Sequence, residues 1–319
     1  MWLLLPSFAL ALGLTATASA IPQTTEQVIC SANSREITSN GTSIWPWQTY
    51  KSSDVAPPNL AVNRTSSKPL FDGLLFLDPV PISNVSGASV YAPLIMDDAG
   101  ELVWQGPNDR TAANLRVQTL DSASVLTYWS GSGTAGAENV VGHGFGEVRI
   151  YDTKYNLINT VCPKISIHTP PGLNAKCVAD VHESNITPRN TILVTVYNYS
   201  TADLSSIGGP KNGWVLDSMA AEVNISSGEV LFSWSPLAHL NLSDSHYPLA
   251  GSGRNDSNPY DFFHINAIQL VGDNYLINSR HFWSTFLVDP KGNIIWEING
   301  KDGGDFGPIP EGGHFVSLN

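Results

Sequence analysis

Positive charge is scarce in this sequence. Its 319 residues include 16 Lys and Arg against 28 Asp and Glu, which gives a formal net charge of -12. Proteins that bind nucleic acid need clustered basic residues to neutralise phosphates, so the composition argues against a nucleic-acid partner. A surplus of acidic groups is instead typical of the surface of a soluble secreted protein.

Helical patterns and long apolar runs are also scarce. From Phe71 onward, short apolar runs alternate with turns rich in Gly, Pro, Asn and Asp, and no segment keeps a helical apolar stripe for long. After the first 20 residues, no apolar run is long enough to span a bilayer. We therefore expect a nearly all-β protein with one large domain.

Several catalytic motifs are missing. The sequence has no serine nucleophile elbow, phosphate-binding loop or dinucleotide fingerprint. The glycine-rich stretch 131–146 lacks the strand-to-helix context of those motifs, and we expect it to be a flexible loop. No two histidines stand at zinc-ligand spacing beside a Cys or carboxylate, so we predict no metal site and no cofactor. The Asp-rich turns have calcium-binding residue types, but most such turns are only turns.

The first 20 residues form a Leu- and Ala-rich apolar segment. It ends in Ala18-Ser19-Ala20, the small-x-small pattern of a signal-peptidase site. A single membrane anchor is the weaker alternative, because the apolar run is shorter than the roughly 20 residues of a span. We expect residues 1–20 to be a cleaved signal peptide and 21–69, rich in Ser, Thr, Asn and Pro, to be an extended N-terminal arm.

Sequons for N-glycosylation are dense. An Asn-x-Ser/Thr sequon alone is weak evidence, but this density is easiest to explain in a secretory chain. The sequons begin at Asn40, Asn63, Asn84, Asn185, Asn198, Asn224, Asn241 and Asn255. We therefore predict a secreted, extracellular glycoprotein.

Only three cysteines are present. Cys162 and Cys177 flank a loop that contains three prolines and a glycine, and we expect a disulfide to close this loop in an oxidising compartment. Spacing alone does not fix the pairing. Cys30 is free, pairs with one of the other two, or has a partner in a part of the molecule that is missing from this sequence.

One hairpin organises the chain, and it runs from Tyr260 to Phe286. Alternation places His264 and Asn266 on one face of the first strand, and Gly272–Asn274 supplies residues that suit a tight turn. The second strand ends in Arg280-His281. A fixed cation beside an imidazole at a strand end is a candidate anion site.

A second polar cluster precedes another predicted strand. Asp180 and His182 are two residues apart, so in a strand they would share a face and could orient one another as a carboxylate–imidazole pair. Glu183 follows. For these histidines and for Arg280, the alternative is a structural role in hydrogen bonds or salt bridges between strands.

A turn motif recurs along the chain, and each copy leads into an apolar strand. The copies are Asp97–Gly100, Asp152–Asn156, Asn224–Gly228 and Asp289–Gly292. Their spacing of roughly 55 to 70 residues is explained by four-stranded units that pack face to face, as in a β-propeller. We place four such units near residues 71–106, 114–161, 177–234 and 262–299. A β-sandwich is the alternative architecture.

The hairpin residues also carry a family resemblance. Asp261–Ala267 followed by Asn274–His281 closely resembles the central signature of the arylsulfotransferase family, in its fungal secreted branch. The usual form reads Asp-Tyr-Phe-His-Ile-Asn-Ser, then Gly-Asn-Tyr-Leu-Ile-Ser-Ser-Arg-His. Asp180–Glu183, Leu193–Tyr197 and Leu231–Trp234 match as well, so the resemblance covers roughly residues 70 to 315.

The resemblance implies a fold, a reaction and a site. The fold is a six-bladed β-propeller over residues 70–319, and the reaction is sulfuryl transfer from an aryl sulfate ester to a phenol by a ping-pong route through a sulfohistidine. The implied catalytic residues are His264, Arg280 and His281, and the implied substrate-binding residues are Asn266, Asp180 and His182. In the family, the nucleophilic histidine belongs to a later part of the propeller.

The family signature normally continues beyond the point where this sequence stops. After Gly-Gly-His-Phe it reads Trp-Gln-His-Asp-Ala, whereas here Phe315 is followed by four more residues, up to Asn319. We therefore expect an incomplete propeller of about four blades, with little turnover of its own. The alternative function is that of a non-catalytic extracellular propeller that binds a glycan or a protein partner.

Overall fold

The described part of the chain is built from β-strands. The computed structural model describes residues 29–31, 37–39, 42–44, 48, 50–58, 60–63, 73–79, 92–133 and 142–308. These residues contain no α-helix and four single-turn 3-10 helices, namely η1 (Ser205–Ile207), η2 (Pro236–Ala238), η3 (Leu242–Asp244) and η4 (Gly304–Phe306). The predicted all-β class is confirmed. The expected signal peptide and the sequons at Asn40 and Asn84 lie outside the described residues.

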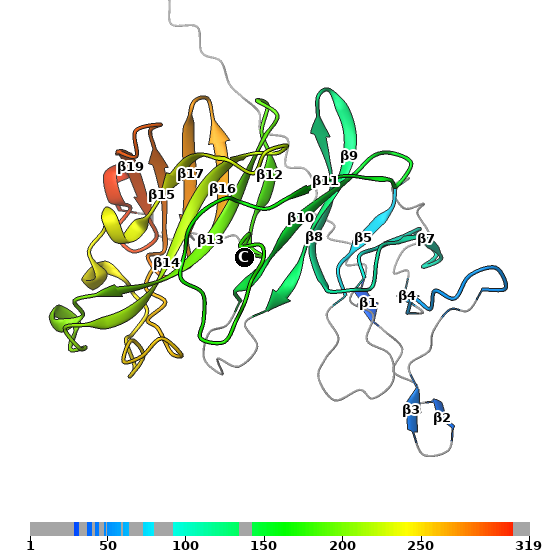
Figure 1. The fold of residues 1–319 in the computed structure, drawn as a ribbon, viewed down its shortest axis with the longest axis horizontal. Coiled ribbons are helices and arrows are strands. Elements are labelled where there is room, and N and C mark those ends of the chain that lie inside the picture. Colours follow the sequence, from blue (N-terminus) through cyan, green and yellow to red (C-terminus); the bar gives the residue numbers. More distant parts are fainter. Residues whose placement is uncertain are drawn as a thin grey trace, which may run out of the picture.

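Four antiparallel sheets follow one another along the chain, each a simple meander (Figure 1). The first contains β5 (Leu75–Leu77), β6 (Leu94–Met96) and β7 (Leu102–Gln105). The second contains β8 (Thr111–Leu120), β9 (Ala123–Gly133), β10 (Gly144–Tyr151) and β11 (Leu157–Val161). The third contains β12 (Ser184–Ile186), β13 (Thr191–Ala202), β14 (Gly213–Asn224) and β15 (Val230–Trp234). The fourth contains β16 (Ile265–Val271), β17 (Asn274–Ser279), β18 (Ser284–Val288) and β19 (Ile294–Asn299).

Two short strand pairs precede these sheets. β1 (Ile29–Ser31) pairs with β4 (Ala61–Asn63), and β2 (Ile37–Ser39) pairs with β3 (Thr42–Ile44). Consecutive sheets of the main body pack on one another, with β5 against β8, β8 against β12, and β13 and β14 against β16. The four sheets coincide with the four units that the sequence predicts.

The repeated motif forms the last turn of each sheet. In three of the four, an aspartate carboxylate caps the turn: Asp97, Asp152 and Asp289 each accept hydrogen bonds from the backbone N–H groups two and four residues later. In the third sheet Asn224 accepts from the N–H groups two and three residues later. This is the turn chemistry that Asp and Asn side chains favour. The strand before every such turn carries a register shift, which bends the sheet edge in the same way each time.

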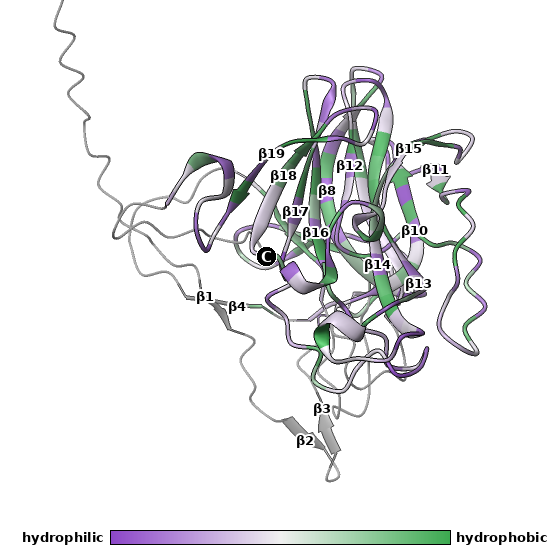
Figure 2. Ribbon diagram, turned by 90° about the vertical axis from the view of Figure 1, so that its left-hand side faces the viewer, coloured by the Kyte–Doolittle hydropathy of each residue, from purple (hydrophilic) through white to green (hydrophobic). Residues whose placement is uncertain are grey.

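The largest hydrophobic core lies between the second, third and fourth sheets. Val148 in β10, Val194 in β13 and Ile277 in β17 are all completely buried in it. Burial of each such side chain contributes about 1.5–3 kcal/mol. Figure 2 shows hydrophobic segments running through the strands of the packed sheets, whereas hydrophilic segments are common in the connecting loops.

Two buried tryptophans join neighbouring sheets. The indole N–H of Trp129 in β9 donates to the Ala179 carbonyl at 2.9 Å, and that of Trp234 in β15 donates to the Gly292 carbonyl at 3.2 Å. Each indole therefore fills space between two sheets and has its one polar atom satisfied.

The glycine-rich stretch differs from its prediction as a flexible loop. In the described part of this stretch, Gly131 lies in β9, and Gly144 and Gly146 lie in β10. A Cβ atom on any of the three would stand within 2.8 Å of the Trp129 ring. The glycines are therefore needed because the indole lies directly on two neighbouring strands, and their small size is a matter of packing rather than flexibility.

The predicted disulfide between Cys162 and Cys177 is confirmed. It ties the residue after β11 to the segment that approaches β12, across a sequence separation of 15. Among the described residues, no helix is long and apolar enough to cross a membrane.

Candidate functional site

Side chains from three consecutive sheets meet in one cluster of imidazoles and carboxylates. His143 stands just before β10, Asp180 and His182 stand before β12, and Asp261 and His264 stand before β16. The ring centroids of His143 and His182 each lie 5.0 Å from that of His264. The cluster thus brings residues more than a hundred positions apart into contact.

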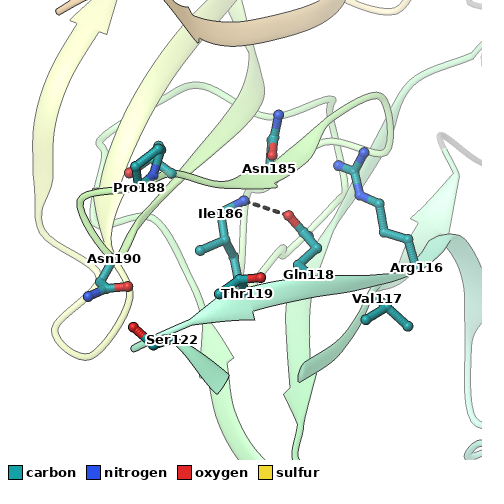
Figure 3. A pocket seen from close by; sticks show the side chains of 10 residues that line it. Arg116, Val117, Gln118, Thr119, Ser122, Asn185, Ile186, Pro188 and Asn190 are labelled. Atoms are coloured by element: carbon teal, nitrogen blue, oxygen red, sulfur yellow. Dashed lines mark hydrogen bonds between the residues drawn. The ribbon is translucent and has the colours of Figure 1, made fainter. Parts of the chain in front are cut away.

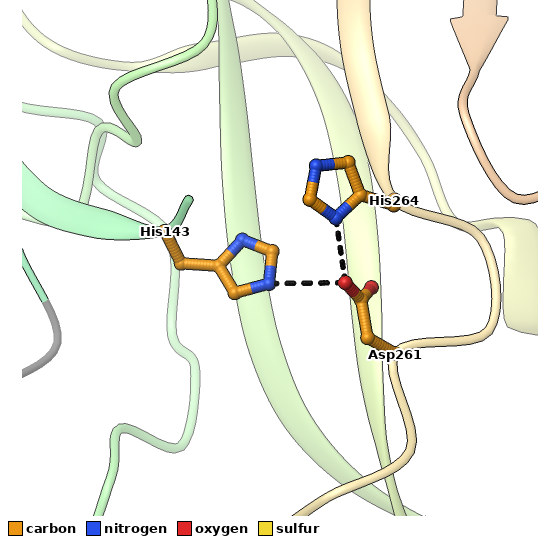
Figure 4. Close-up of side chains that lie close together, drawn as sticks. All are labelled: His143, Asp261 and His264. Atoms are coloured by element: carbon orange, nitrogen blue, oxygen red, sulfur yellow. Dashed lines mark hydrogen bonds and ion pairs between the residues drawn. The ribbon is translucent and has the colours of Figure 1, made fainter. Parts of the chain in front are cut away.

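Asp261 is the shared acceptor of the cluster. Its Oδ2 lies 2.6 Å from Nδ1 of His264 and 3.3 Å from Nε2 of His143 (Figure 4). With the Asp261 carboxylate as acceptor, both ring nitrogens donate to it, which leaves Nε2 of His264 for other contacts. In Figure 4 this second nitrogen points away from Asp261.

Two buried atoms in this group have no hydrogen-bond partner among the described residues. They are Nδ1 of His143 and Oδ1 of Asp261. The His143 side chain is only 1% exposed, and its ring centroid lies 3.8 Å from that of Tyr197. A buried polar atom without a partner costs free energy, and such atoms in native proteins call for a functional or solvent-based explanation.

The backbone of His264 is in an unusual conformation. Its φ angle is 52°, in the left-handed region that non-glycine residues rarely occupy. The expected alternation of His264 and Asn266 on one strand face does not hold, because β16 begins only at Ile265 and its register with β17 shifts between Ile265 and Ala267. His264 is therefore aimed by a local backbone distortion, and distortions of this kind gather at functional sites.

Asp180 and His182 form the carboxylate–imidazole pair that their spacing predicts, although they lie in a bend before β12 rather than in a strand. Oδ1 of Asp180 lies 2.6 Å from Nδ1 of His182. The completely buried carboxylate also accepts from the Thr195 hydroxyl at 3.0 Å and the Gly144 N–H at 2.8 Å. Its oxygens are well satisfied, so the pair is held rigidly.

An isolated bridge between sheets places this pair next to His143. Gly146 in β10 and Ala179 exchange both backbone hydrogen bonds, at 2.9 and 3.0 Å. The bridge aligns the residue after Ala179 with the start of β10, which is why Asp180 reaches the Gly144 N–H. Glu183, by contrast, forms a salt bridge with Arg116 on the second sheet and takes no part in the cluster.

His281 and Arg280 border the cluster from the end of β17. Nδ1 of His281 donates to the backbone carbonyl of Asp261 at 2.6 Å, and its ring centroid lies 4.9 Å from that of His264. Arg280 is exposed, and no side-chain hydrogen bond or ion pair joins it to another described residue. Its positive charge is nevertheless close enough to oppose protonation of His182 and His281, as one of several contributions to their pKa values. It is a free cation at the edge of the imidazoles.

The environment pushes the histidine pKa values in opposite directions. Burial lowers the pKa of His182, but the Asp180 carboxylate outweighs burial and raises it above its ordinary value. Burial lowers the pKa of His264, and Asp261 only partly offsets this effect. Burial also lowers the pKa of His281, to about 4. The environment therefore favours the neutral imidazole at His264 and His281 and the protonated imidazole at His182.

Both carboxylates stay ionised. Burial raises the pKa of each, but the imidazoles of His182 and His143 outweigh it at Asp180, and those of His143 and His264 do so at Asp261. The pKa of each carboxyl therefore lies below its usual range. Tyr197 remains a phenol, because burial raises its pKa well above the ordinary value, and its hydroxyl donates to the Ile265 carbonyl at 3.1 Å.

Two trios in the cluster have donor atoms within 4.8 Å of one another, as a metal site requires. They are His143, Asp261 and His264, and His143, Asp180 and His182. In each trio a carboxylate already lies 2.6 Å from an imidazole nitrogen, so hydrogen bonds account for the geometry without an ion. The donor set of imidazole and carboxylate would suit zinc or copper.

A separate open pocket lies away from these residues (Figure 3). It has a volume of about 620 Å³ and is formed by β8 and the turn between β12 and β13. Gln118 crosses it and accepts a hydrogen bond from the Ile186 N–H at 2.7 Å. The sequon residue Asn185 stands on its wall, so any glycan there would start from this pocket.

Comparison with known proteins assigns the chain to a family. A family model described as arylsulfotransferase (ASST) matches residues 116–316. The chain belongs to the arylsulfotransferase family. The matched region contains every residue of the histidine cluster, from His143 to His281.

Other comparisons add less. A solved structure of a protein of unknown function from Bacteroides caccae matches with a TM-score of 0.34 and 14% sequence identity. The match covers 67% of this chain and 56% of that one, so this arylsulfotransferase-family chain spans little more than half the length of its structural relative. None of the curated proteins matches it.

Sequence reasoning missed two members of the cluster. His143 stands between Gly142 and Gly144, in a stretch expected to be a loop. Asp261 is part of the family signature but is not among the predicted site residues. The signal at His143 is a histidine between two glycines, of which Gly142 faces His182 and His264 and Gly144 packs on Trp129. Asn266 is half-buried at the register shift of β16 and interacts with other residues there.

Proposed function

We propose that this protein transfers a sulfuryl group from an aryl sulfate ester to a phenolic acceptor through His264. The observation that carries the proposal is a pair of histidines whose rings are 5.0 Å apart and whose pKa values are shifted in opposite directions, lowered at His264 and raised at His182. Pairs of titratable groups pushed apart in this way are the usual mark of an acid and a base or nucleophile. Membership of the arylsulfotransferase family supports the reaction class.

The first half-reaction uses Nε2 of His264. With its Nδ1–H held by Asp261, this nitrogen carries a lone pair that attacks the sulfur atom of the ester. The bond from sulfur to the aryl oxygen breaks, and its electron pair leaves with that oxygen. The His182 imidazolium supplies the proton that converts the departing phenolate into a phenol.

The second half-reaction returns both histidines to their starting states. The acceptor phenol gives its proton to the now neutral His182 as its oxygen attacks the sulfur on His264. The N–S bond breaks, and the electron pair returns to Nε2. Through both steps the exposed Arg280 guanidinium is the group that faces the sulfuryl oxygens, which carry negative charge throughout. The family resemblance places the usual nucleophile later in the propeller, and among the described residues His264 best fits that role.

The test is a turnover assay with 4-nitrophenyl sulfate as donor and phenol as acceptor. Because the described residues alone assemble the cluster, we expect more turnover than an incomplete propeller would predict: release of 4-nitrophenol that requires the acceptor, and a sulfuryl adduct on the peptide that contains His264 when acceptor is withheld. His264→Asn should abolish both, because Asn tolerates the left-handed backbone but offers no nucleophile. His168→Asn, at an exposed histidine outside the cluster, is the matched control. A folded protein that binds sulfate but never turns over would instead support the non-catalytic alternative.

The architecture and compartment form part of the same proposal. Four successive meanders that end in the same type of turn are what the blades of a β-propeller would present, and we assign them as blades. A disulfide between Cys162 and Cys177 is compatible with export from the cell. We therefore place the protein outside the cell, with glycans at its sequons. Glycosidase treatment of the secreted product should lower its mass.

A further inference from the structure

Two large aromatic side chains are exposed at the end of the fourth sheet that carries Arg280 and His281. Tyr247 is 44% exposed and lies in the loop between η3 and β16, while Trp283 is 49% exposed and ends the short loop that joins β17 to β18. That loop begins with Arg280. Single exposed apolar residues are ordinary, but these two stand at the same end of the fourth sheet as the proposed catalytic groups.

Tyr247 lies flat on one of those groups. Its ring and that of His281 are stacked, with centroids 4.1 Å apart and planes 6° apart. The neighbouring His246 N–H donates to the His281 carbonyl at 2.8 Å, which fixes the loop in this position. The Tyr247 ring is therefore only one imidazole away from His264.

Trp283 is held out in a strained conformation. Its φ angle is 54°, which is a clear outlier for a bulky side chain, and its carbonyl accepts from the Gly300 N–H at 2.8 Å. One part of the indole packs on His246, with centroids 4.2 Å apart. An exposed ring gains little burial to offset this strain, so the position points to a use in binding.

We propose that Tyr247 and Trp283 form an aromatic platform that holds the ring of a phenol or of its sulfate ester, an inference that rests on the proposed function. Stacking would orient the ring, while Arg280 in the same loop attracts the sulfuryl group. Aromatic pairs favour such stacked or edge-on contacts. Donor and acceptor share the phenolic ring, so one platform serves both half-reactions of a ping-pong route.

The experiment separates the ring from the sulfuryl group by using two probes. Binding of 4-nitrophenol and of inorganic sulfate is measured by calorimetry on the full chain. Trp283→Asn and Tyr247→Leu should each weaken 4-nitrophenol binding about three- to tenfold and leave sulfate binding unchanged. Arg280→Ala should do the opposite. With 4-nitrophenyl sulfate, both platform variants should raise KM more than they lower kcat.

The matched control is Tyr155→Leu, since Tyr155 is also exposed, also has a positive φ angle and stacks on Trp104 of the first sheet. It should change neither affinity. Melting temperatures identify any variant that fails to fold, and the other platform variant then carries the test. Unchanged 4-nitrophenol affinity in a folded variant, or an equal loss of sulfate affinity, would overturn the platform. A platform that binds 4-nitrophenol in a chain without turnover would refute the proposed function alone.

Discussion

The two carboxylate–imidazole pairs of the cluster have the same hydrogen bond and opposite electrostatics. Asp180 and His182 are 2.6 Å apart, as are Asp261 and His264. Yet the pKa of His182 is raised and that of His264 is lowered. Contact with a carboxylate therefore does not by itself fix the protonation state of a histidine.

The difference lies in how each carboxylate is shared. His182 is the imidazole within hydrogen-bond distance of Asp180, whereas Asp261 faces both His264 and His143. In addition, Nδ1 of His281 lies 3.9 Å from Oδ2 of Asp261. At His264 the imidazoles of His143 and His182 add to burial in lowering the pKa, whereas Asp261 joins Asp180 in raising the pKa of His182. The first pair thus favours a cationic acid and the second a neutral nucleophile.

The largest expected effect comes from removal of the shared carboxylate. Asp261→Asn deprives His264 and His143 of their acceptor, and the wrong tautomer of His264 would present a proton instead of a lone pair. By analogy with triad aspartates, kcat should fall about 10³- to 10⁴-fold. Steady-state kinetics with 4-nitrophenyl sulfate measure it. A fall of less than tenfold in a folded variant would show that the second pair does not position a nucleophile.

A smaller effect, with a clear pH signature, follows from removal of the other carboxylate. In the native protein kcat/KM should fall as pH drops through the lowered pKa of His264, which becomes protonated, and fall again as pH rises through the raised pKa of His182, which loses its proton. Asp180→Asn removes the group that raises the His182 pKa. The alkaline limb should therefore move to lower pH while the acidic limb stays.

The same substitution has a consequence for stability. Because the folded pKa of His182 is raised above its unfolded value of about 6.5, its stabilisation is present below that pH and is lost as pH rises through the raised value. The unfolding free energies of native protein and Asp180→Asn should therefore converge as pH rises through this window. A difference that grows there would mean that His182 is neutral in the native fold.

The smallest expected effect on activity comes from the disulfide. Replacement of Cys162 and Cys177 by Ala should lower the unfolding free energy by about 3 kcal/mol, the chain-entropy value for a loop of this length. Cys177 lies three residues before Asp180, so the change loosens the approach to the first pair and leaves the second untouched. We expect the alkaline limb of the pH profile to shift slightly and the acidic limb to stay. Denaturant titrations and pH–rate profiles measure these effects.

Much of the fold follows from local chemistry in the sequence. Aspartate and glycine at fixed offsets define the turns, alternation defines the strands, and the hairpin at Gly272 is closed by residues that accept positive φ angles. These signals act within a few residues, so the four sheets could be predicted with nearly their observed limits. The glycine-rich stretch could not be predicted, because its cause is the Trp129 ring of β9, which lies on Gly131 of the same strand and on Gly144 and Gly146 of β10.

Only part of the candidate site could be predicted from the sequence. Asp180 and His182 pair within two residues, and their contact is local. His143 and Asp261 are 118 residues apart in the sequence. Only the packing of the second, third and fourth sheets around one core brings them together. The distortion at His264 was equally hidden, since nothing in the spacing signals a register shift in β16.

The repeated turns and the cluster lie at opposite ends of the strands. β10 begins at Gly144 beside His143 and ends at the turn of Asp152, and β18 begins in the loop of Trp283 and ends at the turn of Asp289. At the tips of these turns Ala99, Lys154, Ser226 and Lys291 are exposed, whereas the glycines of the turns contact neighbouring segments, as Gly292 does with Trp234. For protein engineering, these tips are the natural attachment points for a fluorophore or an inserted domain, which would report on the molecule without touching its chemistry.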